Sequence, residues 1–498
     1  MLAPLTLDRE SPAPLYRQIV AHMRAAITSG TLMPGQRLAS TRTLAEDWGV
    51  SRNTVLQVFE ILVGEGFLEA RVGDGTYISP NPPDAGTRDR GTQRAAEHDP
   101  QTTAAYPFRR LSRRGSSLIE QRATAGASER PLPFMPDVPD LRMFPMRTWL
   151  RLMNEVSGRL TGDALVQVAN TGYDPLRQAI AHYLRTARDV DCTAEQVIVT
   201  SGSQQGLDLI SRMLLDTGDP VWIEEPGYIG LRAALTANGC NVLPVPADGG
   251  GLDVETGCRH FPAPRMICVS AARQYPLGSS LAPARREALI DFATRAGSWI
   301  LEDDYDSEMR YSGKYLPALQ SIDRAGRVIY MGTFSKTLLP SFRLGYLVVP
   351  KDLIRAFTVA RAVVDRHAPI LEQMVLAEFM HRGLYASHLR RMRTVYRERQ
   401  QAMLAVLADV VGYTPPDFEI EGGMHFVLPL HAHLDDQQVV NDLAQAQIIA
   451  RPLSIYYAGR HKRPGILLGF AAYAPEAIEE AGNRLALLRS LVDRRRDA

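Results

Sequence analysis

One lysine of this chain stands in surroundings that favour covalent chemistry. Of the 56 lysines and arginines only four are lysines, namely Lys314, Lys336, Lys351 and Lys462. Lys336 lies in an apolar and hydroxyl-bearing stretch, residues 333–346, whereas the other three lie in polar, turn-like sequence. An amine can lose its proton and condense with an aldehyde, which a permanently protonated arginine cannot do. The sequence therefore predicts a Schiff-base role for Lys336, and an ordinary surface lysine is the alternative.

An acidic segment at the end of an expected strand, residues 300–306, offers partners for that chemistry. Strand alternation puts Asp303 and Tyr305 on one face and Glu302 and Asp304 on the other. Asp303 could keep a pyridinium nitrogen protonated, as pyridoxal phosphate requires to act as an electron sink, and Tyr305 could bond the ring's phenolic oxygen. We therefore predict Lys336, Asp303 and Tyr305 as the catalytic residues, although an acidic strand-to-loop exit is the plain alternative.

A phosphate-binding turn and a stacking ring complete this pattern. Backbone N–H groups at a helix N-terminus bind phosphate well, and a glycine at the turn after residue 200 lets a ligand approach. Hydroxyls beside the lysine and an arginine seven residues after it add a bidentate phosphate clamp. Each motif alone is weak, but together they predict a pyridoxal phosphate site. The further cofactor contacts predicted are Gly202, Ser203, Gln204, Tyr228, Thr333, Ser335 and Arg343.

Residues 1–80 have the pattern of a helix-turn-helix followed by a wing. Apolar residues recur every four positions from Leu15 to Ile27, as one helix face requires. Ser40 and Ser51 are suitable N-caps for two helices separated by Gly49. The stretch 66–78 then predicts two strands around a tight turn.

The rest of the chain divides into a linker and a larger domain. Residues 81–130 lack apolar periodicity and hold nine arginines and six acidic residues, so we predict a flexible arginine-rich linker. Its basic cluster, residues 109–114, could touch DNA phosphates or be a solvated charge run. Residues 131–498 alternate short β-branched runs with helical stretches, which predicts an α/β fold with a mainly parallel sheet and a smaller C-terminal α+β part.

The N-terminal stretch from about 14 to 78 resembles the winged-helix DNA-binding domain of the GntR superfamily, on residues 38–46 and 50–55. The resemblance implies that the helix after Ser51 enters the major groove of double-stranded operator DNA. Residues 1–80 nevertheless carry seven arginines and eight acids, so the arginines must gather on one face, or dimerisation must supply affinity. A winged helix used for protein contacts is the alternative. The DNA contacts implied are Ser40, Arg42, Ser51, Arg52, Asn53, Thr54, Arg71, Gly73 and Gly75.

The region from about 131 to 490 resembles a fold-type I aminotransferase that uses pyridoxal phosphate, since the motifs follow one another in that family's order. Within 273–278, Gln274 matches a segment whose polar side chain lies near the phenolic oxygen, so it joins the predicted cofactor contacts. The whole architecture resembles the MocR/GabR family of bacterial transcription regulators. This implies a homodimer, domain-swapped head-to-tail, that senses a small amine, amino acid or B6 vitamer by aldimine chemistry at Lys336. The N-terminal stretch has no basic-then-apolar signal, so we expect the protein in the cytoplasm.

Two departures from the family pattern bear on function. Arg273 replaces a common histidine, and Leu467 stands where many aminotransferases have the arginine that holds a substrate carboxylate. Arg451 is a candidate substitute, with a surface arginine as the alternative. A catalytically active aminotransferase carrying a DNA-binding domain, or a protein that has lost its cofactor, are the competing functions. The four cysteines lack metal-ligand spacing, and no apolar run suits a membrane span, so we expect neither a metal nor a membrane partner.

Overall fold

The computed structural model divides into two compact units, residues 1–108 and 109–498. It describes residues 7–9, 11, 13–71, 74–80, 82, 112, 115, 133–160, 162, 169–261, 263–313 and 316–493. The predicted linker, 81–130, lies outside the described residues apart from positions 82, 112 and 115, and so does Gly73.

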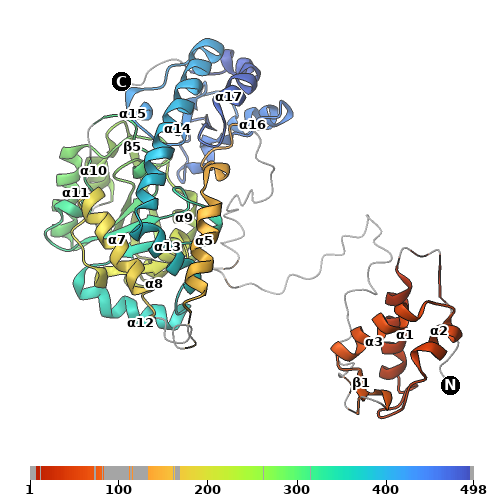
Figure 1. Ribbon diagram of the computed structural model, residues 1–498. Coiled ribbons are helices and arrows are strands. Elements are labelled where there is room, and N and C mark those ends of the chain that lie inside the picture. The colour runs from red at the N-terminus through yellow and green to blue at the C-terminus, as the bar shows by residue number, and fades with distance from the viewer. Residues whose placement is uncertain are drawn as a thin grey trace. The chain divides into compact units, whose positions relative to one another are not determined.

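The N-terminal unit is the predicted winged helix (Figure 1). Ser40 accepts a hydrogen bond from the Thr43 amide at 3.2 Å, and Ser51 accepts one from the Thr54 amide at 3.1 Å, so both serines are N-caps. Gly49 ends the first of these helices at a φ of 62°, in the left-handed conformation that glycine favours. The elements are α1 (Leu15–Thr28), α2 (Thr41–Trp48), α3 (Arg52–Gly64) and the antiparallel pair β1 (Leu68–Arg71) and β2 (Gly75–Ile78).

An eight-stranded sheet forms the centre of the C-terminal unit, with the strand order β3-β10-β9-β8-β7-β4-β5-β6. Its inner strands are parallel, which confirms the predicted α/β class. Strand β10 runs antiparallel between β9 and β3, because its short connection from β9 leaves no room for a crossover helix. The strands are β3 (Val197–Thr200), β4 (Pro220–Glu225), β5 (Asn241–Asp248), β6 (Gly251–Leu252), β7 (Met266–Val269), β8 (Trp299–Asp304), β9 (Val328–Thr333) and β10 (Gly345–Val348).

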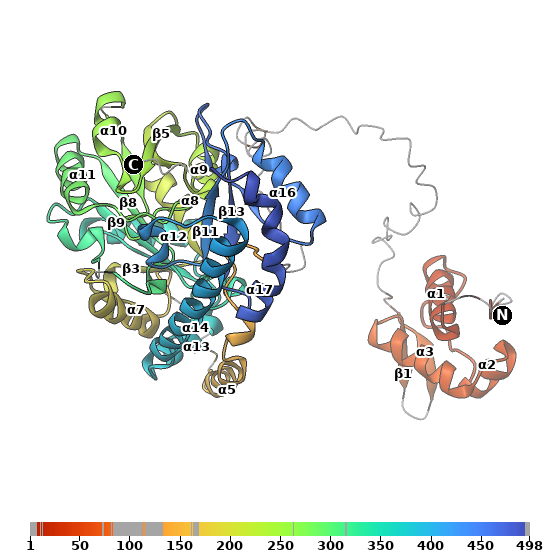
Figure 2. The same cartoon turned by 90° about the horizontal axis from the view of Figure 1, so that it is seen from above.

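Helices cover both faces of this sheet (Figures 1 and 2). Alternate residues of one strand show this: Ile198 packs in the core beneath α8, α9 and α12, whereas Val197 and Val199 pack beneath α5, α7 and α13. Burial on both faces explains the nearly continuous apolar strands. The helices are α5 (Met146–Ser157), α7 (Asp174–Ala187), α8 (Ser203–Leu214), α9 (Ile229–Ala237), α10 (Val254–His260), α11 (Pro283–Ala296), α12 (Ile354–Val364) and α13 (Ile370–His381).

A smaller part follows residue 384, as expected from the sequence. The long helix α14 (Leu384–Val406) lies beside α13 and leads to α15 (Asp417–Ile420), α16 (Asp436–Gln445) and α17 (Pro475–Gly482). Its antiparallel sheet has the order β11-β13-β12, with β11 (His425–Pro429), β12 (Arg451–Pro452) and β13 (Gly465–Gly469). Among the described residues, no helix has the length and apolar character needed to cross a bilayer.

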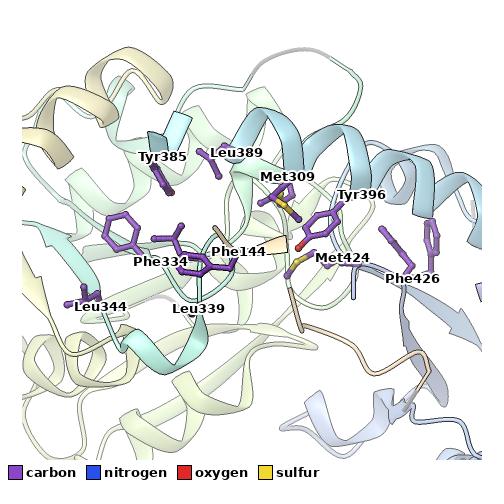
Figure 3. Close-up of a cluster of buried hydrophobic side chains, with 14 of the residues drawn as sticks. Phe144, Met309, Phe334, Leu339, Leu344, Tyr385, Leu389, Tyr396, Met424 and Phe426 are labelled. Carbon is purple, nitrogen blue, oxygen red and sulfur yellow. The ribbon is translucent and has the colours of Figure 1, made fainter. Parts of the chain in front are cut away.

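One hydrophobic cluster joins the two sheets of this unit along α14 (Figure 3). Phe334 and Tyr385 lie at its large-sheet end, and Met424 and Phe426 lie at its small-sheet end. All four side chains are at most 3% exposed. Because interiors are close-packed, this cluster holds the segment after β9 in a fixed relation to the small sheet.

Candidate cofactor and DNA sites

Two turns meet at the end of the large sheet because β10 begins with a glycine. Gly345 is paired with Thr200 of β3 on one side and with Thr333 of β9 on the other. A Cβ on Gly345 would lie 3.0 Å from the carbonyl oxygen of Gly332 and 3.2 Å from the carbonyl carbon of Gly202. The absent side chain therefore lets the predicted phosphate turn and the lysine segment approach closely.

The approaching turns form a cradle rich in N–H donors and positive charge. Gly202 is the N-cap of α8 at a φ of 87°, and a Cβ there would lie 3.2 Å from the guanidinium carbon of Arg343. Arg343 donates to the carbonyl of Ser201 at 3.2 Å, and the Ser335 amide donates to the Thr333 hydroxyl at 3.2 Å. The free N–H groups of the first turn of α8, at Ser203 and Gln204, complete an arrangement that suits a phosphate.

The amine of Lys336 is held close to a residue that we did not single out from the sequence. Lys336 follows β9 by three residues, between the buried Phe334 and Leu338. Its Nζ donates to the carbonyl oxygen of Asp137 at 2.9 Å and lies 3.9 Å from the Asp137 carboxylate oxygen Oδ1. The lysine is therefore 24% exposed and its amine points into the unit instead of into solvent.

Asp303 lies where its negative charge is disfavoured, and Tyr305 carries a buried hydroxyl without a partner among the described residues. Burial and the charge of Asp304 raise the pKa of Asp303 to about 7, and Lys336 acts against that shift. The Tyr305 hydroxyl has no hydrogen-bond partner among the described residues, and its burial raises its pKa. A cationic ring nitrogen would favour the ionised Asp303, and a phenolate oxygen would accept from Tyr305. These residues and the phosphate cradle fit pyridoxal phosphate.

The side chain of Gln274, a predicted cofactor contact, is hydrogen-bonded within the protein. The Gln274 amide nitrogen donates to the carbonyls of Pro226 and Tyr275, both at 2.7 Å, which ties it to its own loop and its neighbour. Tyr275 instead makes edge contacts with Tyr228 at 6.0 Å and with Tyr305 at 5.6 Å between ring centroids. Tyr228 in turn accepts a hydrogen bond from Gln204 Nε2 at 3.2 Å, which links the stacking candidate to the phosphate turn.

Asp137 lies at the centre of a second group of side chains near the Lys336 amine. Its Oδ2 accepts from the Tyr275 hydroxyl at 2.6 Å and lies 3.3 Å from Arg451 Nη1, and its Oδ1 lies 3.5 Å from His425 Nδ1. Burial disfavours its charge, but the charges of Lys336 and Arg451 and the hydrogen bond from Tyr275 act against this, and the pKa of Asp137 is lowered to about 2. No local pattern predicts this role, because Asp137 precedes Lys336 by 199 residues and meets it only in the folded chain.

Arg451 and Arg273 are both brought near the site. Arg451 on β12 stands directly opposite Leu467 on β13, the position where the family's arginine is absent. Arg451 therefore lies beside the position where many aminotransferases have their carboxylate-binding arginine, and there it pairs with Asp137. Arg273 is buried 3.6 Å from Asp306, which follows Tyr305.

A cavity of about 480 Å³ lies beside this region, next to Asp306, Glu308 and Arg310. None of the predicted cofactor residues lines it. Within the described part of the chain, no three His, Cys, Asp or Glu side chains gather in a way that could hold a metal ion.

In the N-terminal unit, the predicted DNA contacts are of two kinds. Arg52 and Asn53 are exposed in the first turn of α3, and Arg42 is exposed on α2 with a loose ion pair to Glu46 at 3.5 Å. The Ser40 and Ser51 hydroxyls, in contrast, cap helices, and the Thr54 hydroxyl lies 2.8 Å from that of Ser51. The arginines are free for a ligand, while the serine hydroxyls already have partners.

The wing holds the predicted Arg71, and Arg37 and Arg9 lie near the wing and the turn although neither was predicted from the sequence. Arg71 packs over the Tyr77 ring at 4.5 Å, and Arg37 lies against Gly75, where a Cβ would be 3.1 Å from its Nε. Arg9 donates to the carbonyl of Gly49 in the helix-turn-helix turn at 2.7 Å. Most arginines of this acidic unit therefore lie near α2, α3 or the wing, as DNA binding by one face requires.

Comparison with known proteins agrees with this architecture. Residues 141–485 match the family model "Aminotransferase class I and II", and residues 15–78 match "Bacterial regulatory proteins, gntR family". The chain is 39% identical to the probable rhizopine catabolism regulatory protein MocR of Rhizobium meliloti, over 97% of this chain and 95% of the relative. It is 32% identical to the HTH-type transcriptional regulator TauR of Rhodobacter capsulatus, over 94% and 95%.

A solved structure shares the fold of the C-terminal unit. The α-aminoadipate aminotransferase LysN of Thermus thermophilus, complexed with N-(5'-phosphopyridoxyl)-L-leucine, superposes with a TM-score of 0.66 at 27% identity. The match covers 76% of this chain and 95% of that chain. Membership of the aminotransferase class I and II family confirms the prediction that the cofactor is pyridoxal phosphate. The chain thus belongs to the MocR family of transcriptional regulators, in which a gntR-type DNA-binding domain is joined to an aminotransferase class I and II domain.

Proposed function

We propose that a small amine bound beside Lys336 changes the affinity of the winged helix for operator DNA. The observation that carries this proposal is the Lys336 amine, which Asp137 holds in the same site as Asp303, whose pKa is raised, and Tyr305, whose hydroxyl has no partner among the described residues. A DNA-binding unit on the same chain gives that chemistry a regulatory output.

In this proposal each group at the cofactor site has one task. Pyridoxal phosphate, when bound, supplies an aldehyde and an electron-withdrawing ring. The cradle of Gly202, Ser203 and Arg343 binds the phosphate, Asp303 holds the ring nitrogen, and Tyr305 donates to the phenolic oxygen. Lys336 is the covalent anchor that an incoming amine displaces.

On DNA, the exposed first turn of α3 would face base edges in the major groove. Arg52 and Asn53 suit guanine and adenine edges, while Arg42 and the wing arginines Arg37 and Arg71 suit phosphates. We assign Ser40 and Ser51 to helix capping, with any DNA contact limited to their backbone N–H groups.

A homodimer would place two such units on two operator half-sites. Support for a second copy comes from α12, which exposes Val359 at 58%, Val363 at 81% and Val364 at 40%. Val359 and Val363 are four residues apart and share one helix face. Such apolar exposure is typical of a surface that another protein covers. A protein that binds operator DNA works in the cytoplasm, where bacterial DNA lies.

The effector acts only if it binds the two states of the dimer with different affinity. A coupling free energy of about 1 to 3 kcal/mol, usual for allostery, would change operator affinity about 5- to 150-fold. Because an amine displaces Lys336 from the cofactor, the displaced side chain and its bond to Asp137 differ between the two states. That difference is local to the lysine site.

The proposal is tested with full-length protein loaded with pyridoxal phosphate. Duplex DNA selected from a random pool serves as the operator, and its Kd is measured with and without a panel of primary amines. We expect one amine class to shift the visible band and the operator Kd together in the wild type and in Lys351→Ala, but not in Lys336→Ala. An operator Kd that ignores both cofactor and amines would refute sensing, and repeated turnover with a keto acid would favour the aminotransferase function.

A further inference from the structure

We infer that the effector site selects a small primary amine that carries a hydrogen-bond donor near its amine, and that it rejects amines carrying a carboxylate there. The inference deepens the proposed function and rests on it. The donor can be a hydroxyl or a second amine, since both offer the same hydrogen-bond chemistry. The contacts around Asp137 support this inference.

Asp137 presents one carboxylate oxygen that has no hydrogen-bond partner. The side chain is 9% exposed, and Oδ2 is occupied by the Tyr275 hydroxyl and by Arg451. Oδ1 is buried and accepts no hydrogen bond from any described residue. It lies 3.9 Å from Lys336 Nζ, so a group one or two carbons from an amine bound there is within its reach. A buried, ionised, unsatisfied oxygen strongly favours a donor.

The neighbour of Oδ1 is a second acceptor. His425 Nε2 lies 2.9 Å from the carbonyl oxygen of Pro276, and a carbonyl can only accept, so Nε2 carries the proton. Burial lowers the pKa of His425, which favours the neutral ring with a lone pair on Nδ1. That lone pair faces Asp137 Oδ1 at 3.5 Å. Two acceptors facing each other across this distance can share a ligand's N–H or O–H, whereas a carboxylate would add a third acceptor.

The guanidinium that a carboxylate would need is already paired. Arg451 stands opposite Leu467, so it is the guanidinium near the position that holds the substrate carboxylate in many aminotransferases. Its Nη1 lies 3.3 Å from Asp137 Oδ2. A carboxylate ligand would have to compete with Asp137 for this guanidinium and would then sit beside the negative charge of Asp137. Leaving a buried charge unpaired is strongly unfavourable.

The test uses pairs of amines that differ in one group. Alanine is compared with alaninol, and glycine with ethanolamine and diaminoethane. Their affinities for the cofactor-loaded full-length protein are measured by calorimetry and by the shift of the visible band. We expect the alcohols and the diamine to bind at least about 10-fold more tightly than the acids, which corresponds to about 1.4 kcal/mol.

Two variants make the inference sharper. Asp137→Gly should reverse the preference, because it frees Arg451 and removes the negative charge. Glycine suits the φ of 67° at this position, so the backbone is not strained. Asp189→Gly is the matched control, since Asp189 is an exposed aspartate with a φ of 54° at the end of α7. Adding Arg451→Gln to Asp137→Gly should remove the gained affinity for acids.

The outcomes separate this inference from the proposed function. If the wild type binds acids as tightly as their alcohols, or if Asp137→Gly leaves the preference unchanged, the selectivity is refuted while amine sensing stands. If no amine shifts the band although pyridoxal phosphate binds, sensing itself fails and the selectivity fails with it. Binding of pyridoxal phosphate to the cofactor-free Asp137→Gly variant shows that the site still folds.

Discussion

The lysine site and the DNA-reading face present their polar groups in opposite ways. Around Lys336, the Tyr305 hydroxyl and Asp137 Oδ1 are buried without a hydrogen-bond partner, and the pKa of Asp303 is raised to about 7. In the described N-terminal unit, such an unpartnered buried atom is found only at His22. The lysine site is thus built for ligands that replace water completely, whereas the winged helix keeps its arginines solvated until a polyanion arrives.

This difference has an energetic consequence. Buried, unmatched groups destabilise the cofactor-free protein, and a ligand that matches them restores that free energy as binding. Exposed arginines cost the fold little, so their replacement should change DNA affinity without changing stability.

The largest effect is expected for Lys336→Ala. The variant should lose the visible band of the lysine-bound cofactor completely, because no other amine is held at this position. Lys351→Ala, which removes an exposed lysine, should keep the band. An unchanged spectrum in Lys336→Ala would show that the covalent anchor lies elsewhere. The buried site around Lys336 would then not be the cofactor site.

Asp303→Asn should weaken pyridoxal phosphate binding yet stabilise the cofactor-free protein at alkaline pH. The pKa of Asp303 rises from 3.8 to about 7 on folding, so the unfolded chain releases this proton first and stability falls as the pH rises towards 7. Between about pH 5.5 and about pH 8.5, the wild type should lose about 2 kcal/mol more than the variant.

Denaturant unfolding at both pH values measures this difference, and absorbance titration gives the cofactor affinity. Asp352→Asn, at an exposed acidic residue, is the control and should behave as the wild type. Equal pH dependence of stability in the wild type and in Asp303→Asn would mean that the pKa of Asp303 is not raised in the folded protein. The lysine site would then not differ from the DNA-binding face in this respect.

Arg52→Ala should weaken operator binding by about 1 to 3 kcal/mol, or about 5- to 150-fold, and leave both cofactor binding and thermal stability unchanged. The expected loss is smaller than that at the lysine site because many phosphate contacts remain. Arg24→Ala removes an arginine paired with Glu65 on the same unit and is the matched control. A stability loss in Arg52→Ala without an affinity loss would contradict the proposed surface role.

Much of the cofactor side was readable from the sequence because its groups follow strand ends. Asp303 and Tyr305 share a face by alternation, and the phosphate turn and lysine segment each follow an apolar strand. That Gly345 brings these turns together required the antiparallel β10, which periodicity did not reveal. The effector side was not readable, because Asp137 meets Arg451 across 314 residues and through a different sheet.

In the winged helix, too, the sequence predicts local features but not contacts between distant segments. Helix caps and the wing turn are local, so their positions followed from residue type and spacing. Which exposed arginines join the DNA face is not local: Arg9 and Arg37 reach the turn and the wing from segments without helical or strand periodicity. Hydroxyl roles also depend on geometry, since a serine that can bind phosphate can equally cap a helix.

The smallest effect concerns that last ambiguity, at Ser51. The Ser51 hydroxyl accepts from the Thr54 amide, so Ser51→Ala should destabilise the winged helix by about 1 kcal/mol, whereas Ser51→Gly should cost only a few tenths of a kcal/mol. The unfolding transition of the winged helix, followed in the full-length protein, measures this. If the hydroxyl contacts DNA instead, Ala and Gly should weaken operator binding equally and leave that transition alike. A lower stability of Ser51→Ala than of Ser51→Gly would therefore show that the serine hydroxyl caps the helix, and DNA contact would be left to the arginines.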